Sequence, residues 1–207
     1  MYNITQYSDI PGFGSFGDIY NELLLSLTDN ATILEIGVAF SRGTWAMLDA
    51  MRGNMSLCVL DSFHHDSQEL FNFATLAGST SKMSISDYET FAVFSKIYSQ
   101  SEMFLRCISQ HSKYHQLQTV YTMSSDLYIS SKYPATYDLV FLDGDHSYET
   151  VKLELEYFKD CTVVTGHDYN NHGCPGVKQA VDEFVADHPD RLLRIYDEHM
   201  VFVITKS

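Results

Sequence analysis

The chain has 207 residues and a mass of 23.6 kDa, a size that suits one domain over residues 1–207 rather than two. Hydrophobic residues make up 45% of the sequence and charged residues 19%, which excludes a disordered or low-complexity protein. Its 27 acidic and 13 basic side chains give a formal charge of -14, and such a surface repels phosphate backbones and anionic lipids. We therefore expect no nucleic acid and no membrane among its partners.

No stretch of the sequence has the features of a targeting or membrane-spanning segment. The longest uninterrupted apolar run, residues 200–204, is far shorter than the roughly 20 residues that cross a bilayer. The first residues have neither the basic nor the apolar stretch of a signal peptide, which predicts a cytoplasmic protein. Cysteines without a C-x-x-C pair are expected in that compartment to be reduced thiols, and we assign them no role. They are Cys58, Cys107, Cys161 and Cys174.

The first half of the chain alternates helical and strand patterns. An N-terminal arm and helix are predicted over residues 1–30, followed by a strand over 32–36 and a helix over 44–51. A second strand covers 57–60. Residues 64–115 are too long for one crossover helix and predict a helical insertion of two or three helices after the second strand.

The second half continues the alternation and ends differently. Strands are predicted over 118–121, 137–142 and 161–165, and helices over 148–158 and 177–185. Two final strands, 192–196 and 200–204, are close enough to form a hairpin. These units predict an α/β fold with a mainly parallel sheet, helices on both faces and a C-terminal antiparallel hairpin. Ligands of such sheets bind beyond the carboxyl ends of the strands.

A glycine turn follows the first predicted strand. Gly37 permits a close backbone approach to a ligand, and free N–H groups at the start of the next helix can receive a carboxylate. Glu35 before the turn and Asp61 after the second strand favour a ribose-binding site. A nicotinamide oxidoreductase is the least favoured reading, because Ala39 stands within the turn and the next glycine is only Gly43, so that G-x-G-x-x-G is absent.

Three segments resemble a known family. Residues 33–44 resemble motif I of class I S-adenosylmethionine-dependent methyltransferases, in which an acidic residue, any residue, a glycine and a short turn bind the methionine end of the cofactor. Residues 137–149 and 166–184 look like signatures of the group of macrocin-type sugar O-methyltransferases and cephalosporin-hydroxylase-like proteins, or methyltransferase family 24. The resemblance spans about residues 30–205 apart from the helical insertion. It implies a Rossmann-like methyltransferase sheet and an acceptor hydroxyl on a small molecule or sugar.

The same resemblance implies a set of cofactor-binding residues. They are Glu35, Gly37, Ala39 and Ser41 in and beside the turn, Asp61 and Ser62 at the ribose, Asp126 near the adenine, and Asp143. An alternative role for Asp126 is to cap the helix that begins at Leu127.

Two aspartates are candidate metal ligands. Asp143 and Asp168 follow strands that we expect to be neighbours, so their carboxylates can converge on an octahedral Mg²⁺. In the family that the sequence resembles, the metal is held by the first aspartate of one motif and by two consecutive acids of the next. His167 stands where one of these acids is expected. Either Mn²⁺ is better tolerated with an imidazole there, or His167 is not a ligand.

Asp145 and His146 are the candidates for the catalytic base. Related enzymes use a carboxylate at the third position of this motif or a histidine at the fourth, and a metal-bound hydroxyl needs only a moderate base. We favour His146. An alternative role for Asp145 is to cap the helix that begins near Ser147.

Together these features predict an O-methyltransferase assisted by Mg²⁺ or Mn²⁺. Two alternatives stay open: a metal-independent transferase, and a non-catalytic binding protein of the same fold, which Ser41 favours by replacing the third glycine usual in the family. The glycine-rich loop 11–17 suits a mobile flap over a pocket or a loose N-terminal arm. The sequence also leaves a homo-oligomer open.

Overall fold

A computed structural model of the chain describes residues 3–12, 16–78, 82 and 84–207. Residues 1–2, 13–15, 79–81 and 83 lie outside the description, and with them parts of the predicted arm, glycine-rich loop and helical insertion. Within the described residues, no helix combines the length and the apolar character needed to span a bilayer.

Contacts divide the chain into two compact units, each assembled from three segments. The helical unit comprises Met1–Ser26, Val38–Arg52 and Phe63–Leu117. The sheet unit comprises Leu27–Gly37, Gly53–Ser62 and Gln118–Ser207. The single domain expected over residues 1–207 stays a prediction, because a division by compactness does not show whether either unit folds alone.

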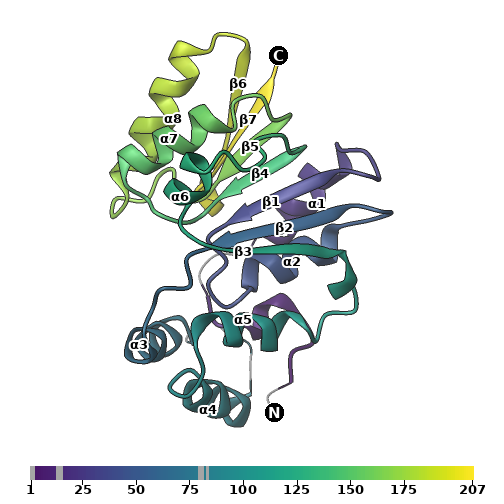
Figure 1. The fold of residues 1–207 in the computed structure, drawn as a ribbon, viewed down its shortest axis with the longest axis vertical. Coiled ribbons are helices and arrows are strands. Elements are labelled where there is room, and N and C mark those ends of the chain that lie inside the picture. The colour runs from purple at the N-terminus through teal and green to yellow at the C-terminus, as the bar shows by residue number, and fades with distance from the viewer. Residues whose placement is uncertain (1–2, 13–15, 79–81, 83) are drawn as a thin grey trace. The chain divides into compact units, whose positions relative to one another are not determined.

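A mixed sheet forms the centre of the sheet unit. Its described strands are β1 (Thr32–Ile36), β2 (Ser56–Asp61), β3 (Leu117–Thr122), β4 (Leu139–Leu142), β5 (Val163–Gly166), β6 (Arg191–Tyr196) and β7 (Val201–Lys206). They lie in the order β3-β2-β1-β4-β5-β7-β6 (Figure 1). β1 pairs in parallel with β2 and β4, and β4 with β5, whereas β7 runs antiparallel to β5 and β6. The predicted α/β fold with a C-terminal antiparallel hairpin is confirmed.

The strand ends of this sheet line up along one edge. The last residues of β1, β4 and β5, which are Ile36, Leu142 and Gly166, are register partners. The residues that follow them therefore emerge side by side, as expected where parallel strands end. These three strands are buried at nearly every position, because a continuous apolar run fits a strand that is covered on both faces.

Three helices of the sheet unit cover one face of the sheet: α6 (Ser125–Ser130), α7 (Tyr148–Tyr157) and α8 (Pro175–Asp187). Figure 1 shows α7 and α8 side by side. Their apolar side chains form one buried core with those of β1, β4, β5 and β7. The hydroxyl of Ser147 starts α7 by accepting a hydrogen bond from the backbone N–H of Thr150, and Pro175 occupies the first turn of α8.

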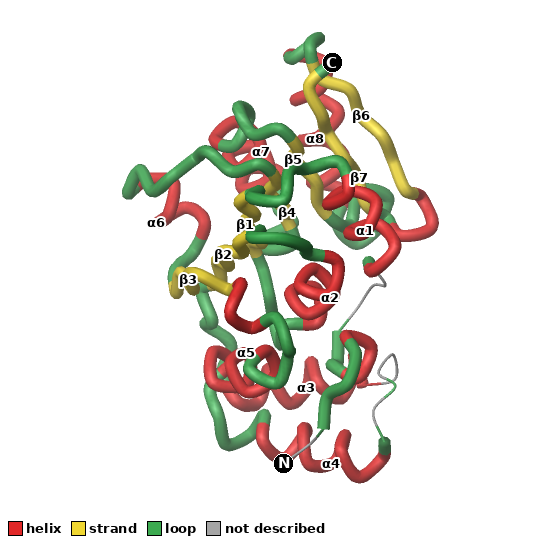
Figure 2. Tube along the Cα trace, turned by 90° about the vertical axis from the view of Figure 1, so that its right-hand side faces the viewer, coloured by secondary structure: helices red, strands yellow, loops and turns green. Residues whose placement is uncertain are grey.

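The helical unit contains the predicted insertion. Its described elements are η1 (Tyr7–Asp9), α1 (Gly17–Leu25), α2 (Arg42–Ala50), α3 (Ser67–Gly78), α4 (Ile85–Phe94), α5 (Gln100–Ile108) and η2 (Tyr114–Gln116). The helices α3, α4 and α5 lie together in both views (Figure 2), so the expectation of two or three helices is confirmed. The ring of Phe40 packs edge-on against those of Phe73 and Phe91, at centroid distances of 5.4 and 5.0 Å.

Some element boundaries differ from the sequence prediction. The strand expected from Cys161 begins at Val163, because the N–H of Cys161 donates to the carbonyl of Phe158 and closes the turn after α7. The helix expected from Thr44 begins at Arg42. The connection in the C-terminal hairpin is a short 3-10 helix, η3 (Asp197–His199).

Candidate active site

The turn after β1 packs tightly against the end of β4. Gly37 has a φ of +82°, and its N–H donates to the carbonyl of Leu60 over 2.9 Å. A Cβ at Gly37 would lie 2.1 Å from the carbonyl oxygen of Asp143, so no other residue fits. The structure thus shows a close approach of Gly37 to the backbone of Asp143, and the approach to a ligand expected at this turn stays a prediction. Glu35 is only 2% exposed, an unusual place for a carboxylate in an apolar strand.

Two residues of the same turn keep a conformation that favours glycine. Ala39 has a φ of +45° and Ser41 a φ of +81°. Ser41 therefore retains the left-handed backbone that a glycine would supply, at a cost in strain. The hydroxyls of Ser41 and Thr44, at the start of α2, are buried and have no hydrogen-bond partner among the described residues. Buried hydroxyls without partners at a helix start suit a polar ligand.

The other cofactor candidates lie at strand ends and at the start of a helix. Asp61 is the last residue of β2 and is half-buried, and Ser62 follows it. Because Leu60 is the register partner of Ile36, Asp61 and Gly37 emerge side by side. Asp126 is exposed in the first turn of α6, whose cap is the hydroxyl of Ser124. The alternative reading of Asp126 as the helix cap is therefore wrong.

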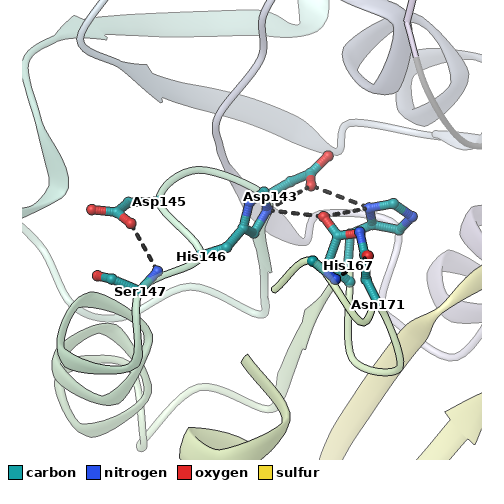
Figure 3. A network of polar contacts seen from close by, with 8 residues as sticks. Asp143, Asp145, His146, Ser147, His167 and Asn171 are labelled. Carbon is teal, nitrogen blue, oxygen red and sulfur yellow. Dashed lines mark hydrogen bonds and ion pairs between the residues drawn. The ribbon is translucent and has the colours of Figure 1, made fainter. Parts of the chain in front are cut away.

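Four ionisable side chains meet where β4 and β5 end (Figure 3). The Nδ1 atom of His167 lies 3.5 Å from Oδ1 of Asp143 and 3.2 Å from Oδ2 of Asp168. The Nε2 atom of His146 lies 3.6 Å and 3.1 Å from the same two oxygens. The predicted convergence of Asp143 and Asp168 is thus present, with both histidines placed between the carboxylates.

The charges of this cluster stabilise one another. Burial disfavours a charged His167, but the carboxylates of Asp143 and Asp168 outweigh it and raise the pKa of His167 to about 10. Burial likewise opposes a charged Asp168, while hydrogen bonds from His167 and Asn171 lower the pKa of Asp168 to about 2. The Asp143 carboxylate raises the pKa of His146 despite burial. Without a metal, His167 therefore holds a proton at neutral pH that balances the carboxylates.

The two candidate bases have different surroundings. Both carboxylate oxygens of Asp145 accept hydrogen bonds from the start of α7: Oδ1 from the N–H of Ser147 at 2.8 Å and Oδ2 from the hydroxyl of Thr150 at 3.2 Å. These bonds lower the pKa of Asp145. Figure 3 shows Asp145 turned toward Ser147, away from the cluster that contains His146. This geometry favours His146 as the base, although both roles stay predictions.

The sequence prediction missed a glutamate beneath the site. Glu154 of α7 is 1% exposed, and its Oε1 atom has no hydrogen-bond partner among the described residues. It lines a cavity of about 10 Å³ together with Asp145, His146 and His167, room for about one water molecule. Burial raises the pKa of Glu154 to about 7. The signal in the sequence was its position on the apolar face of α7, one residue before Leu155.

The cluster offers a donor set that suits a divalent cation. Asp143, His167 and Asp168 each provide one ligand atom, and these atoms lie within 4.8 Å of one another. Two carboxylates supply the charge and oxygen that Mg²⁺ or Mn²⁺ requires, and an imidazole nitrogen is a better ligand for Mn²⁺. Asn171, also missed from the sequence, holds Oδ1 of Asp168 with a hydrogen bond of 2.7 Å. The residues present therefore fit such an ion.

Comparison with known proteins adds independent information. The sequence model of a family described as "Methyltransferase domain" matches residues 34–169, from β1 to just beyond Asp168. A search of curated proteins finds no match to this sequence.

Several solved structures share the fold. An O-methyltransferase from Bacillus cereus, solved with S-adenosylhomocysteine, superposes with a TM-score of 0.55 at 13% identity, over 92% of this chain and 80% of that one. TomG of Streptomyces achromogenes, an O-methyltransferase of tomaymycin synthesis solved with S-adenosylmethionine, gives 0.58 at 13% identity, over 100% and 92%. CalS11, a TDP-rhamnose 3'-O-methyltransferase of calicheamicin biosynthesis, gives 0.52 at 15% identity, over 92% and 76%. At these identities the superpositions establish the fold.

Proposed function

This chain belongs to the methyltransferase domain family, and we propose that it is an S-adenosylmethionine-dependent O-methyltransferase. Its acceptor is a hydroxyl of a small molecule or sugar, and Mg²⁺ or Mn²⁺ assists the reaction. The observation that carries this proposal is the meeting of Asp143, His146, His167 and Asp168 at the adjacent ends of β4 and β5. The activity described for the three structures above, O-methyl transfer in each case, supports a hydroxyl acceptor.

The residues proposed to hold the cofactor are those named from the sequence. Glu35, Gly37, Ala39 and Ser41 would bind its methionine end, Asp61 and Ser62 the ribose and Asp126 the adenine. The buried hydroxyl of Ser41 and the side-by-side position of Gly37 and Asp61 support this assignment. When bound, the cofactor supplies a methyl group on a positively charged sulfur.

The metal is proposed to bind Asp143 and Asp168, with His167 beside them. Such an ion lowers the pKa of a coordinated hydroxyl and orients two neighbouring acceptor oxygens. Asn171 holds the Asp168 carboxylate in place, and the contact with Gly37 fixes the backbone of Asp143.

His146 is proposed to accept the proton of the acceptor hydroxyl at Nε2, the atom that faces both carboxylates. Methyl transfer would form the bond between the acceptor oxygen and the methyl carbon and break the carbon–sulfur bond, with S-adenosylhomocysteine as the product. Asp145 keeps the loop before α7 in shape through its bonds to Ser147 and Thr150.

The remaining parts of the proposal concern partners and location. We propose a cytoplasmic enzyme that binds neither nucleic acid nor membranes, in keeping with its charge of -14. Light scattering of the purified chain tests for a homo-oligomer.

The first experiment is calorimetric titration of the purified chain with S-adenosylhomocysteine, once with Mg²⁺ and once with chelator. We expect a micromolar dissociation constant, about -8 kcal/mol. Methyl transfer from labelled S-adenosylmethionine to a panel of sugar hydroxyls then follows, with Mg²⁺, Mn²⁺ or chelator.

The outcomes separate the alternatives. Absence of binding in both buffers, together with no thermal shift, would leave a non-catalytic protein of the methyltransferase fold. Turnover that is indifferent to chelator would instead identify a metal-independent transferase. Turnover that requires Mg²⁺ or Mn²⁺ supports the proposal in full.

A further inference from the structure

Cys174 lies at the end of the loop that carries His167 and Asp168. Hydrogen bonds fold this loop back on itself: the N–H of Asn171 donates to the carbonyl of Asp168 over 3.2 Å, and the N–H of Cys174 to the carbonyl of Asn171 over 2.9 Å. Cys174 occupies the cap position of α8, but its side chain makes no capping hydrogen bond. The local structure of the helix therefore does not account for the position of the thiol.

The thiol belongs to a second group of ligand atoms at the same strand ends. One atom each of His146, Asp168 and Cys174 lies within 4.8 Å of the others. In the described part of the chain, this group shares Asp168 with the group formed by Asp143, His167 and Asp168. Ligand atoms around a tetrahedral zinc ion lie about 3.5 Å apart, by the usual bond lengths. Small side-chain rotations would bring the three atoms to binding distance.

One further observation indicates that the group is prepared for a cation. The Nε2 atom of His146 is buried, and its contacts with the carboxylates are ion pairs without the alignment of a hydrogen bond.

The chemistry of the two groups differs. Mg²⁺ takes oxygen ligands, and a thiol and an imidazole do not suit it. Thiolate, imidazole and carboxylate, with a water in the fourth position, suit Zn²⁺, and affinity for such sites rises toward the end of the first transition series.

We propose that His146, Asp168 and Cys174 form a second metal site, selective for a thiophilic divalent ion such as Zn²⁺, whose occupation inhibits the enzyme. Inhibition rests on the proposed function, because the bound ion takes the Nε2 lone pair that His146 needs as a base and takes Asp168 from the oxygen-rich site. The Cys174 thiol gives its proton to the solvent as the thiolate binds the ion. A thiophilic ion such as Zn²⁺ and Mg²⁺ therefore compete for Asp168, and they have opposite effects on the rate of methyl transfer.

The first test uses Co²⁺ alone as a spectroscopic probe of the full chain. A thiolate ligand gives cobalt a charge-transfer band in the near-ultraviolet, whereas nitrogen and oxygen ligands do not. We expect the band in the native chain and its loss in Cys174→Ser. The matched control is Cys58→Ser, since Cys58 is also half-buried but lies in β2, outside both ligand groups. A band that persists in Cys174→Ser, or cobalt binding without any band, overturns the proposal.

The second test measures Zn²⁺. Competition with a chromophoric chelator should show an affinity at least tenfold weaker in Cys174→Ser, since the loss even of an outer partner costs about 10- to 100-fold. Zn²⁺ should also protect Cys174 of the native chain from alkylation, read by mass spectrometry, which keeps the proposal testable if the variant does not fold. Absence of protection overturns it.

These readouts are independent of the proposed function. The cobalt band and alkylation need neither cofactor nor acceptor. Failure of S-adenosylhomocysteine binding would remove the proposed function and leave the zinc site standing. Zn²⁺ that fails to inhibit Mg²⁺-supported turnover, in a chain that shows the band, would remove the inhibitory role alone.

Discussion

Replacing the buried Glu154 with glutamine should stabilise the protein at alkaline pH. Glu154 is 1% exposed on α7, and Asp145 of the preceding loop and Asp126 of α6 both disfavour its charge. A hydrogen bond from Ser125 and the nearby His146 act in the opposite direction, but burial dominates and raises the pKa of Glu154 from 4.5 to about 7.

The magnitude follows from linkage. Above pH 4.5 the unfolded chain releases the proton of Glu154, whereas the folded chain retains it until about pH 7. The free energy of unfolding therefore falls as the pH rises between these values, by about 3 kcal/mol in total, and stays constant above them. Glutamine has nearly the same shape and no charge, so Glu154→Gln escapes this loss. The two proteins should be similar at pH 4.5, and the variant more stable by up to about 3 kcal/mol at pH 8.

Urea unfolding of both proteins at a series of pH values measures this difference. Other groups that titrate in the same range contribute equally to both proteins and cancel in the difference. Glu156→Gln is the matched control, because Glu156 is exposed on the same helix, and it should follow the native profile. Parallel profiles for Glu154→Gln and the native chain would refute the assignment of a proton to Glu154 at neutral pH.

Three further changes test the site and the fold. Asp143→Ala should abolish methyl transfer without loss of the folded state, as measured by turnover and circular dichroism; native rates would contradict the metal-assisted mechanism. Gly37→Ala places a Cβ against the carbonyl of Asp143, at a residue whose φ is positive. It should lower the free energy of unfolding, measured in urea, by at least about 2 kcal/mol. An unchanged unfolding midpoint would be inconsistent with the contact. Ser99→Ala removes the hydroxyl that accepts a hydrogen bond from the N–H of Glu102 at the start of α5, with an expected loss of about 1 kcal/mol, while the backbone N–H of residue 99 still donates to the Glu102 carboxylate. Equal stability of Ser99→Ala would show that the capping hydroxyl of Ser99 contributes nothing.

The sheet and its aspartates could be predicted because they depend on local pattern and on one rule of topology. Short apolar runs between helical patterns locate the strands, and parallel strands present their carboxyl ends at one edge, which brings Asp143 and Asp168 together.

What the sequence did not reveal depends on loops and burial. The approach of Cys174 to Asp168 results from hydrogen bonds within the loop after β5, which no periodicity encodes. The bonds from Ser147 and Thr150 that engage both oxygens of Asp145 depend on the path of the chain into α7. Ser41 looked like a departure from the family pattern, because the sequence shows a serine in place of a glycine. A residue type does not reveal its φ angle, so the left-handed backbone that Ser41 shares with a glycine could not be predicted.

The position of β7 affects the order of folding. β6 precedes β7 in the chain but joins the sheet only through it, so the edge of β5 stays open until the hairpin docks. Docking also fixes the loop that carries His167 and Asp168, because the carbonyl of Met200 accepts the N–H of Tyr169 over 2.9 Å. A nascent chain that has reached only residue 200 therefore exposes an aggregation-prone strand edge and lacks the support of the loop that carries His167 and Asp168. Binding competence should appear late in folding, with the last hairpin.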